Sequence, residues 1–334
     1  GNALRSLENM LPDLTVLPDL RMIAYSYDSA GRVIGVSYPD GTKAEFHYGP
    51  DGRLVRAKND AATVAYERDA LGRVRTETID DVVVESGFGP DGLRSSGRTS
   101  LGAEWWAAFD PLGDLDALSI GPTPGARDGE IRFERDALGR EVARAMPGGV
   151  RVEWQRDVAG RPLARRITRS RVGEVPWELG LVRYGFRGED QLSSLLDPIA
   201  GPRFFDHDAR GRVVRERRAD RAIDRAMDEV GNVYRAADRS DRRYGRGGRL
   251  EEAAGSRFEH DAEGRPIRKI TSDGRQWEYQ WNGAGLLAEV ATPEGTRVRF
   301  AYDPFARRTA KTRVRIDAEG AEQVERETRY VWDG

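Results

Sequence analysis

The chain has 334 residues, and its 54 lysines and arginines nearly balance its 56 aspartates and glutamates, which leaves a formal net charge of −2 at pH 7. Such a mixed charged surface predicts solubility rather than nucleic-acid binding. The sequence contains no cysteine, so neither a disulfide framework nor thiol chemistry is expected.

Residues 1–21 precede the pattern that fills most of the chain. Leu4, Leu7, Met10 and Leu11 have the spacing of one short helix, which Pro12 would break. We interpret this segment as a linker or as a cover for the edge of the first strand, since exposed strand edges need protection. A disordered boundary is the alternative. Residues 1–20 lack the basic and apolar regions of a signal peptide, and no apolar run reaches the roughly 18 residues of a membrane helix.

From residue 22 onward the sequence is dominated by a repeat. The stretch Tyr27-Asp28-Ser29-Ala30-Gly31-Arg32-Val33 returns about every 21 residues as far as residue 310, and a final copy at Tyr302–Arg307 has alanine in place of glycine. The aspartate can cap its own backbone two residues on, and glycine supplies the positive φ of a tight turn. The residues that we assign to this structural motif include Tyr27, Asp28, Gly31, Arg32, Asp69, Gly72, Arg73, Asp136, Gly139, Arg140, Asp208, Gly211, Arg212, Asp261, Gly264, Arg265, Tyr302 and Asp303.

A second set of turn signals, such as Pro39-Asp40-Gly41, lies midway between these motifs. The segments between turns alternate with period two, as where Trp277, Tyr279 and Trp281 alternate with glutamate and glutamine. One unit is therefore strand, turn, strand, turn. About 13 such hairpins would make a sheet too wide to stay flat, so we expect an all-β fold, a spiralling antiparallel β-ribbon that forms part of a hollow shell or barrel-like cocoon.

Two regions depart from the rhythm. Between Ser95 and Arg132 we expect an extended hairpin with a loop at residues 121–125, in which Trp105 and Trp106 point to opposite faces. Further on, Arg169–Leu181 is expected to form an additional loop, and Tyr184–Leu195 a decayed copy of the repeat.

The sequence offers no catalytic, cofactor-binding or metal-binding constellation. The chain has three histidines, and His207 and His260 precede motif aspartates at a position that is aromatic in other copies, while His47 lies on the polar face of its strand. An active site needs one unique constellation, whereas a turn cap is needed in every unit, so we interpret the aspartates as caps rather than as calcium ligands or acids. The motif arginines could form a ladder that attracts an acidic cargo or polymer. The alternative, which the near-zero net charge favours, is that they pair with glutamates and aspartates on neighbouring strands.

The Tyr-Asp-x-x-Gly-Arg pattern resembles the YD repeat of Rhs proteins, which are similar to the C components of Tc toxins and to the repeat region of teneurins. The resemblance covers residues 22–310. Residues 311–334 are similar to the last strands that lead toward the Rhs core, a self-cleaving element whose own motifs do not occur as a set here, so no catalytic residue is transferred.

The resemblance implies a non-enzymatic shell segment that encapsulates a C-terminal toxin domain until delivery. The implied partners are that toxin, the remaining shell of the same parent protein, and a secretion-apparatus spike or chaperone. The implied location is that of a secreted or delivered effector, or the cell surface. An extracellular module that binds glycans or a partner protein is the alternative, motivated by the aromatic strip of Trp277, Tyr279 and Trp281. An enzyme within these residues is a third and weaker interpretation.

Overall fold

The computed structural model describes residues 13–16, 22–121, 129–171, 173–188, 190–317 and 319–333. These fall into two compact units. We call Gly1–Glu85 together with Arg242–Gly334 the terminal unit, and Ser86–Asp241 the central unit. The predicted boundaries at residues 21 and 310 remain a prediction, because they are set by where the sequence repeat begins and ends, whereas the two units are defined by compactness.

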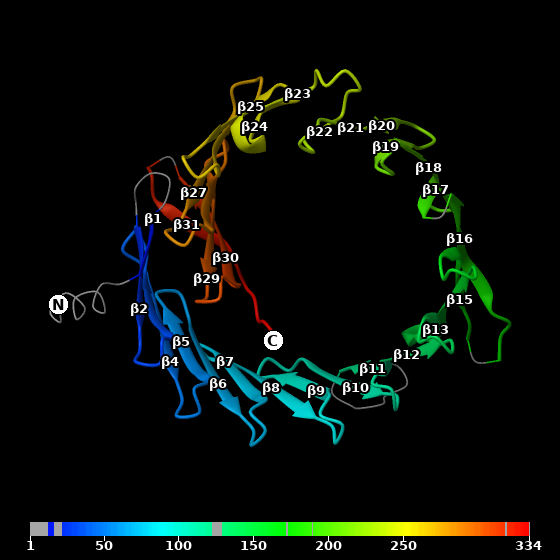
Figure 1. Ribbon diagram of the computed structural model, residues 1–334, viewed down its shortest axis with the longest axis horizontal. Coiled ribbons are helices and arrows are strands. Elements are labelled where there is room, and N and C mark those ends of the chain that lie inside the picture. Colours follow the sequence, from blue (N-terminus) through cyan, green and yellow to red (C-terminus); the bar gives the residue numbers. More distant parts are fainter. Residues whose placement is uncertain are drawn as a thin grey trace, which may run out of the picture. The chain divides into compact units, whose positions relative to one another are not determined.

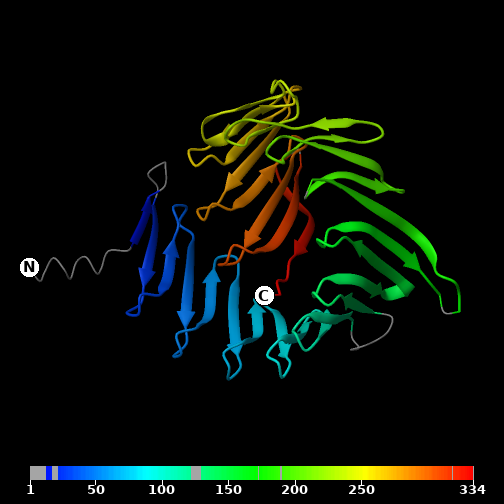
Figure 2. The same ribbon diagram turned by 45° about the vertical axis from the view of Figure 1, so that its right-hand side comes forward.

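The terminal unit contains two series of strands, each an antiparallel meander in which neighbours in sequence pair (Figures 1 and 2). The first series is β1 (Asp13–Val16), β2 (Met22–Tyr27), β3 (Val33–Ser37), β4 (Lys43–Tyr48), β5 (Leu54–Asn59), β6 (Thr63–Arg68), β7 (Val74–Ile79) and β8 (Val82–Phe88), whose last residues, from Ser86 on, are assigned to the central unit. The second series is β23 (Arg242–Tyr244), β24 (Leu250–Ala253), β25 (Ser256–His260), β26 (Pro266–Ile270), β27 (Gln276–Trp281), β28 (Leu287–Ala291), β29 (Thr296–Tyr302), β30 (Arg308–Ile316) and β31 (Glu322–Arg329), with a short 3-10 turn, η2 (Arg246–Gly248), after β23.

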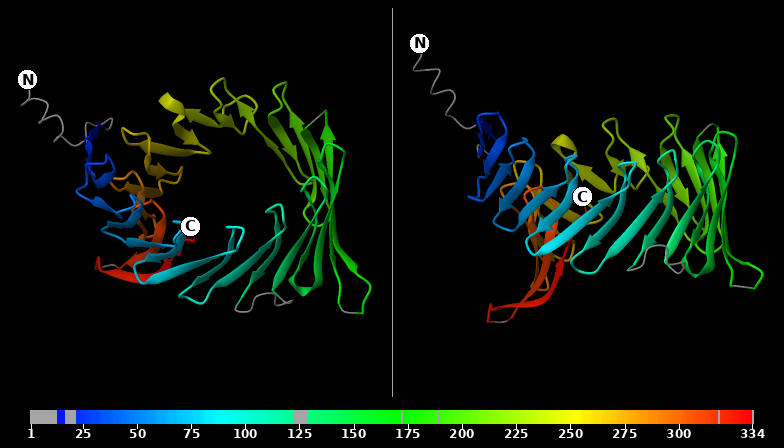
Figure 3. Two further views of the ribbon diagram at one scale, coloured as in Figure 1. Left: turned by 60° about the horizontal axis from the view of Figure 1, so that its bottom comes forward. Right: turned by 90° about the horizontal axis from the view of Figure 1, so that it is seen from below.

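The central unit is a further antiparallel meander (Figure 3). It consists of β9 (Arg94–Thr99), β10 (Glu104–Phe109), β11 (Leu115–Ile120), β12 (Glu130–Arg135), β13 (Glu141–Met146), β14 (Val150–Arg156), β15 (Pro162–Arg169), β16 (Trp177–Arg187), β17 (Gln191–Asp197), β18 (Gly201–His207), β19 (Val213–Arg217) and β20 (Ala222–Asp224). The 3-10 turn η1 (Pro147–Gly149) joins β13 to β14, and the short strands β21 (Ala226–Met227) and β22 (Val233–Tyr234) pair with each other.

The all-β, antiparallel hairpin fold expected from the repeat is confirmed. The hairpins also explain the two irregular regions. Trp105 and Trp106 are successive residues of β10, so they occupy opposite faces of it. The loop expected at Arg169–Leu181 is shorter than predicted, because Arg169 ends β15 and residues 177–181 belong to β16, which pairs with it. The expected decayed copy, Tyr184–Leu195, lies in the paired strands β16 and β17.

Part of the expected N-terminal linker can be compared with the structure. Residues 13–16 form β1, which pairs antiparallel with β2, so the edge of the first repeat strand is covered. The helix expected before Pro12 and most of the loop at residues 121–125 lie outside the described residues.

The two units differ in how much they bury. In the terminal unit one face of β4 to β8 carries a row of buried residues, including Ala44, Ala57, Val64, Ile79 and Val84. Among the described residues of the central unit, the buried apolar side chains are Ala117, Ala143 and Val182. The main apolar core of the described chain therefore sits in the terminal unit.

Candidate functional site

Each full copy of the motif folds into the same five-residue turn, for which Asp69–Arg73 is representative. The Asp69 N–H donates to the carbonyl of Arg73 at 3.0 Å, and the Gly72 N–H donates to the carbonyl of Asp69 at 2.8 Å. Gly72 has a φ of 80°. Glycine is favoured at this position because other residues rarely adopt a positive φ.

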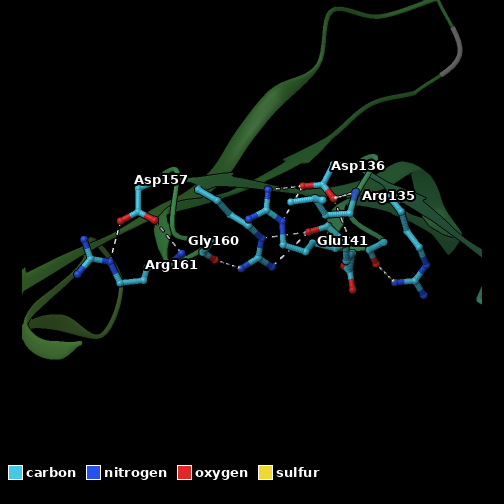
Figure 4. Close-up of polar contacts among 10 residues, drawn as sticks. Arg135, Asp136, Glu141, Asp157, Gly160 and Arg161 are labelled. Atoms are coloured by element: carbon cyan, nitrogen blue, oxygen red, sulfur yellow. Dashed lines mark hydrogen bonds and ion pairs between the residues drawn. The ribbon is translucent and has the colours of Figure 1, made fainter. Parts of the chain in front are cut away.

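The motif carboxylate uses both oxygens to hold the turn. Oδ1 of Asp69 accepts from the N–H groups of Leu71 and Arg73, each at 3.0 Å, while Oδ2 accepts from Nε of Arg73 at 2.7 Å. Figure 4 shows the same arrangement at Asp136 and Asp157. The carboxylate–arginine pair is present, at 2.7 Å in each case, in Asp28–Arg32, Asp69–Arg73, Asp136–Arg140, Asp157–Arg161, Asp208–Arg212, Asp261–Arg265 and Asp303–Arg307.

These bonds fix the protonation state of the carboxylates. A hydrogen bond from the side chain of the paired arginine holds the pKa below its ordinary value at Asp69, Asp136 and Asp157. A carboxylate held ionised has no proton to donate as an acid, and both oxygens of these groups already accept hydrogen bonds within the turn. In the described part of the chain, no group of three or more His, Asp or Glu side chains could hold a metal.

Some copies reach the same turn with other side chains. Asn232 replaces arginine and donates through Nδ2 to Oδ2 of Asp228 at 2.7 Å. In the turn that begins at Gly49, which has no side chain, Asp51 accepts the Arg53 N–H at 3.1 Å instead. The backbone turn is therefore retained even where the motif residues change.

The residue just before the first residue of the turn, which is the aspartate in full copies of the motif, links one repeat to the previous one. We call this position the staple. The hydroxyls of Tyr48 and Tyr302 donate to the carbonyls of Val33 and Leu287, each at 2.9 Å, and the Trp281 indole N–H donates to the Pro266 carbonyl at 2.9 Å. Each acceptor follows directly after the motif of the preceding hairpin, so the staple joins neighbouring hairpins through an additional side-chain bond.

Arginine also fills the staple position, which the sequence pattern did not indicate. Nη1 of Arg156 donates to the Gly160 carbonyl of its own turn at 3.1 Å, and Nη2 donates to the carbonyl of Glu141 in the preceding repeat at 3.2 Å (Figure 4). Arg68 and Arg135 bond in the same way. The sequence does place arginine directly before Asp69, Asp136 and Asp157, but which carbonyl of the preceding repeat accepts its bond depends on strand register.

The histidines lie where the repeat places them. His207 and His260 are half-buried at staple positions, at the ends of β18 and β25. His47 is exposed on β4. The interpretation of His207 and His260 as aromatic substitutes stays a prediction.

Several motif arginines also lie against the glycine of the following motif. A Cβ built on Gly72 would lie 1.6 Å from Nη1 of Arg53, and one on Gly160 would lie 2.7 Å from Nη1 of Arg140. At these sites glycine is favoured by both the backbone angle and the packing of the arginine. The full-motif arginines pair with the aspartate of their own turn. Arg265 pairs in addition with Glu263, and Arg307 pairs in addition with Glu77 on another strand.

The aromatic strip on β27 is partly occupied by contacts within the protein. Trp277, Tyr279 and Trp281 are half-buried. Lys269 and Arg275 lie over the Trp277 ring at 5.0 and 5.4 Å from its centroid. The indole N–H of Trp281 is already bonded. This strip could therefore offer ring faces and edges to a ligand, but fewer free polar groups than the sequence suggested.

Comparison with known proteins agrees with the repeat geometry. The family model described as RHS Repeat matches residues 27–62, 260–297 and 281–322. Double-stranded DNA deaminase toxin A of Burkholderia cenocepacia is 28% identical over 93% of this chain and 26% of its own length. Toxin protein Tse5 of Pseudomonas aeruginosa is 28% identical over 92% of this chain and 26% of its own length. The chain thus spans about a quarter of the curated relatives that match most of it.

Solved structures share the fold at low sequence identity. The TcdB2–TccC3 crystal structure gives a TM-score of 0.66 with 14% identity, covering 95% of this chain and 20% of that one. The Tc holotoxin pore of Photorhabdus luminescens gives a TM-score of 0.62 with 12% identity, covering 90% of this chain and 20% of that one.

The recurring turn, its carboxylate–arginine pair and the staple define a β-hairpin repeat protein. Together with the family-model match and the two toxin relatives, they make the chain similar to Rhs, or YD-repeat, proteins. No helix in the described residues is both long and apolar enough to cross a membrane.

Proposed function

We propose that this chain is a structural wall segment of an Rhs-type polymorphic toxin, and that the parent protein encloses a C-terminal toxin domain until delivery. The observation that supports it most directly is the repeated, stapled hairpin, because a meander joined hairpin to hairpin can extend over a wide surface without a separate core for each repeat. The toxin and the remaining shell are the partners that this function requires.

The two faces of the central unit suit a wall with different surroundings on each side. On one face, Arg151 pairs with Glu134 at 2.6 Å and with Glu153 at 3.0 Å. The strand register places Phe133, Val152 and Ile167 together on the opposite face. In β12 to β15, one face thus carries these ion pairs, and the other carries apolar and aromatic groups with interspersed arginines, of which Arg144 pairs with Glu141 at 2.7 Å.

Within this proposal the chain acts as a scaffold and carries no catalytic residue. The motif carboxylates support this role because they are already used as hydrogen-bond acceptors in the turns. The corresponding location is that of an effector protein that is delivered out of the producing cell. A hydrolase activity that maps to residues 1–334 and is lost on replacement of one motif aspartate, with the fold intact, would contradict the scaffold role.

The test of enclosure uses the natural parent polypeptide. Its intact mass and peptide sequencing should reveal a larger product with a variable C-terminal piece beyond the repeats. Under native conditions that piece should resist a protease that digests it once the repeats are unfolded by denaturant. If the piece is digested equally fast in both conditions, or if no such piece exists, enclosure is wrong.

A second candidate, glycan or protein binding, is favoured by the β27 strip. Trp277 is the residue to test, because its ring is half-buried on β27 and, unlike Trp281, it does not occupy a staple position. Trp277→Ala should abolish any signal on a glycan array if this function is correct. Leu71→Ala, at an exposed turn tip, is the control variant. A blank array with the unmodified protein would leave the wall function as the remaining proposal.

A further inference from the structure

The last motif copy, Asp303–Arg307, touches the first repeats of the same unit. The Asn59 side-chain amide donates to the Tyr302 carbonyl at 2.9 Å across 243 residues of sequence. Nη2 of Arg307 donates to Oε1 of Glu77 at 2.6 Å across 230 residues. Figures 1 and 3 show β29 and β30 beside β5 to β7, in agreement with these bonds.

An aromatic contact accompanies the polar bonds. The Phe305 ring lies 6.3 Å from Phe46 and 6.1 Å from Tyr66, between ring centroids. The register of β4 to β7 aligns Phe46 with Ala57, Val64 and Ile79 on one face of the sheet. Ala57 and Val64 have no exposed surface. Phe305 therefore packs on the most buried face of the described chain.

The charges at this contact are withdrawn from solvent. The side chain of Asp303 is 0% exposed, that of Glu77 5% and that of Arg307 17%. Arg307 bonds to both carboxylates, through Nε to Asp303 at 2.7 Å and through Nη2 to Glu77 at 2.6 Å. Loss of the arginine would leave two buried carboxylates without their cation, which is strongly unfavourable.

Comparison with the other copies shows that this turn is specialised. At the tip position that Phe305 occupies, Leu71 is 73% exposed, Leu112 is 88% exposed and Leu138 is 75% exposed, whereas Phe305 is 36% exposed. The last copy also has Ala306 at a φ of 63°, where the other full copies have glycine. The preceding copy also reaches the first repeats, where the Gly283 N–H donates to Oδ2 of Asp40. The last copy adds an aromatic contact and a buried ion cluster to its long-range bonds and departs from the motif glycine, which points to a separate role.

We propose that the Asp303–Arg307 turn is a clasp, which docks on the face of β4 to β7 and closes the terminal unit. The clasp joins the first repeats to the last ones directly, and not only through the 156-residue chain of the central unit, Ser86–Asp241. Opening it exposes the apolar face of β4 to β7 while the hairpins themselves remain paired. The proposal does not depend on the wall function, because it concerns a contact inside this chain.

The absence of cysteine from the sequence allows a direct test. In the full chain, Val64→Cys places a single thiol on the buried face near the clasp, and Val182→Cys places one at a buried site of the central unit as a control. Thiol labelling rates are measured for each in three backgrounds: unmodified, Arg307→Ala and Arg265→Ala. Arg265 is the matched control because it pairs with the aspartate of its own turn, as Arg307 does, and no bond to the first repeats is described for it.

If the clasp exists, Arg307→Ala should speed labelling of the thiol at position 64 at least tenfold and leave the thiol at position 182 unchanged, and Arg265→Ala should leave both unchanged. An unchanged rate at position 64 would overturn the proposal. Should Arg307→Ala speed both thiols because the fold is lost, the milder variants Arg307→Lys and Phe305→Leu decide. Selective labelling at position 64 in these variants supports a clasp, and equal acceleration at both positions refutes it.

Discussion

At the scale of single residues, the motif aspartate is the part of the repeat most sensitive to pH. Because the pKa of Asp69, Asp136 and Asp157 is lowered in the folded state, the unfolded chain binds more protons than the folded chain once the pH falls to about 4. Their stabilising contribution is thus complete above the unfolded pKa of about 3.8 and is lost as the pH falls further, through the lowered folded values.

We therefore predict that the denaturant midpoint of the protein is flat near neutral pH and falls steeply below about pH 4. Asp69→Asn removes one of the titrating groups, so its midpoint should be lower at pH 7 but should fall less between pH 5 and pH 3. Urea unfolding followed by circular dichroism at several pH values measures this. Parallel curves for the two proteins would contradict the assignment of acid sensitivity to the turns.

Ala306 is a second residue with a predictable effect. An alanine at a φ of 63° is strained by contact of its Cβ with the backbone, by about 1 kcal/mol. Ala306→Gly should relieve that strain and raise the free energy of unfolding by about 0.5 kcal/mol. The gain is smaller than the strain itself because glycine also increases the entropy of the unfolded chain. Gly285→Ala, at the preceding copy with a φ of 76°, is the reverse change and should destabilise the protein. Chemical denaturation of both variants shows whether each one raises or lowers the free energy of unfolding.

At the scale of the hairpin, the staple tolerates different chemistry as long as a donor reaches the preceding carbonyl. Tyr48→Phe keeps the ring but loses the hydroxyl that donates to Val33, so it should cost about 1 kcal/mol. Tyr48→Arg should cost less than Tyr48→Ala, because Arg156 and Arg135 already fill this position with two donors. Equal losses for arginine and alanine would contradict this account. The three unfolding free energies, measured under one condition, provide the comparison.

The turn was predictable from sequence and the staple was not, for a physical reason. The bonds of Asp69 reach only as far as Arg73, so the residues that specify them lie within one short stretch. The bond of Tyr48 to Val33 spans 15 residues and depends on strand register, which no local pattern encodes. The clasp spans 230 residues or more, and its one sequence signal was the replacement of glycine by Ala306 in the final copy.

At the scale of the whole molecule, the two units should differ in stability. Backbone hydrogen bonds are formed in both, but the terminal unit adds buried apolar side chains and the buried Glu77–Arg307–Asp303 cluster. Few side chains are buried among the described residues of the central unit, so a larger share of its side chains is in contact with solvent. Regions with fewer buried contacts open at lower free energy.

We predict that amide hydrogens of β9 to β20 exchange faster than those of β4 to β7 and β28 to β30 in hydrogen exchange followed by mass spectrometry. Low urea should widen the difference, because the less buried unit opens first and unfolding then departs from two-state behaviour. Arg307→Ala should accelerate exchange in β4 to β7 and leave the central unit unchanged, whereas Val182→Ala should do the opposite. Uniform exchange across both units, or acceleration of both units by either substitution, would mean that the described chain opens as one cooperative unit in spite of its uneven burial.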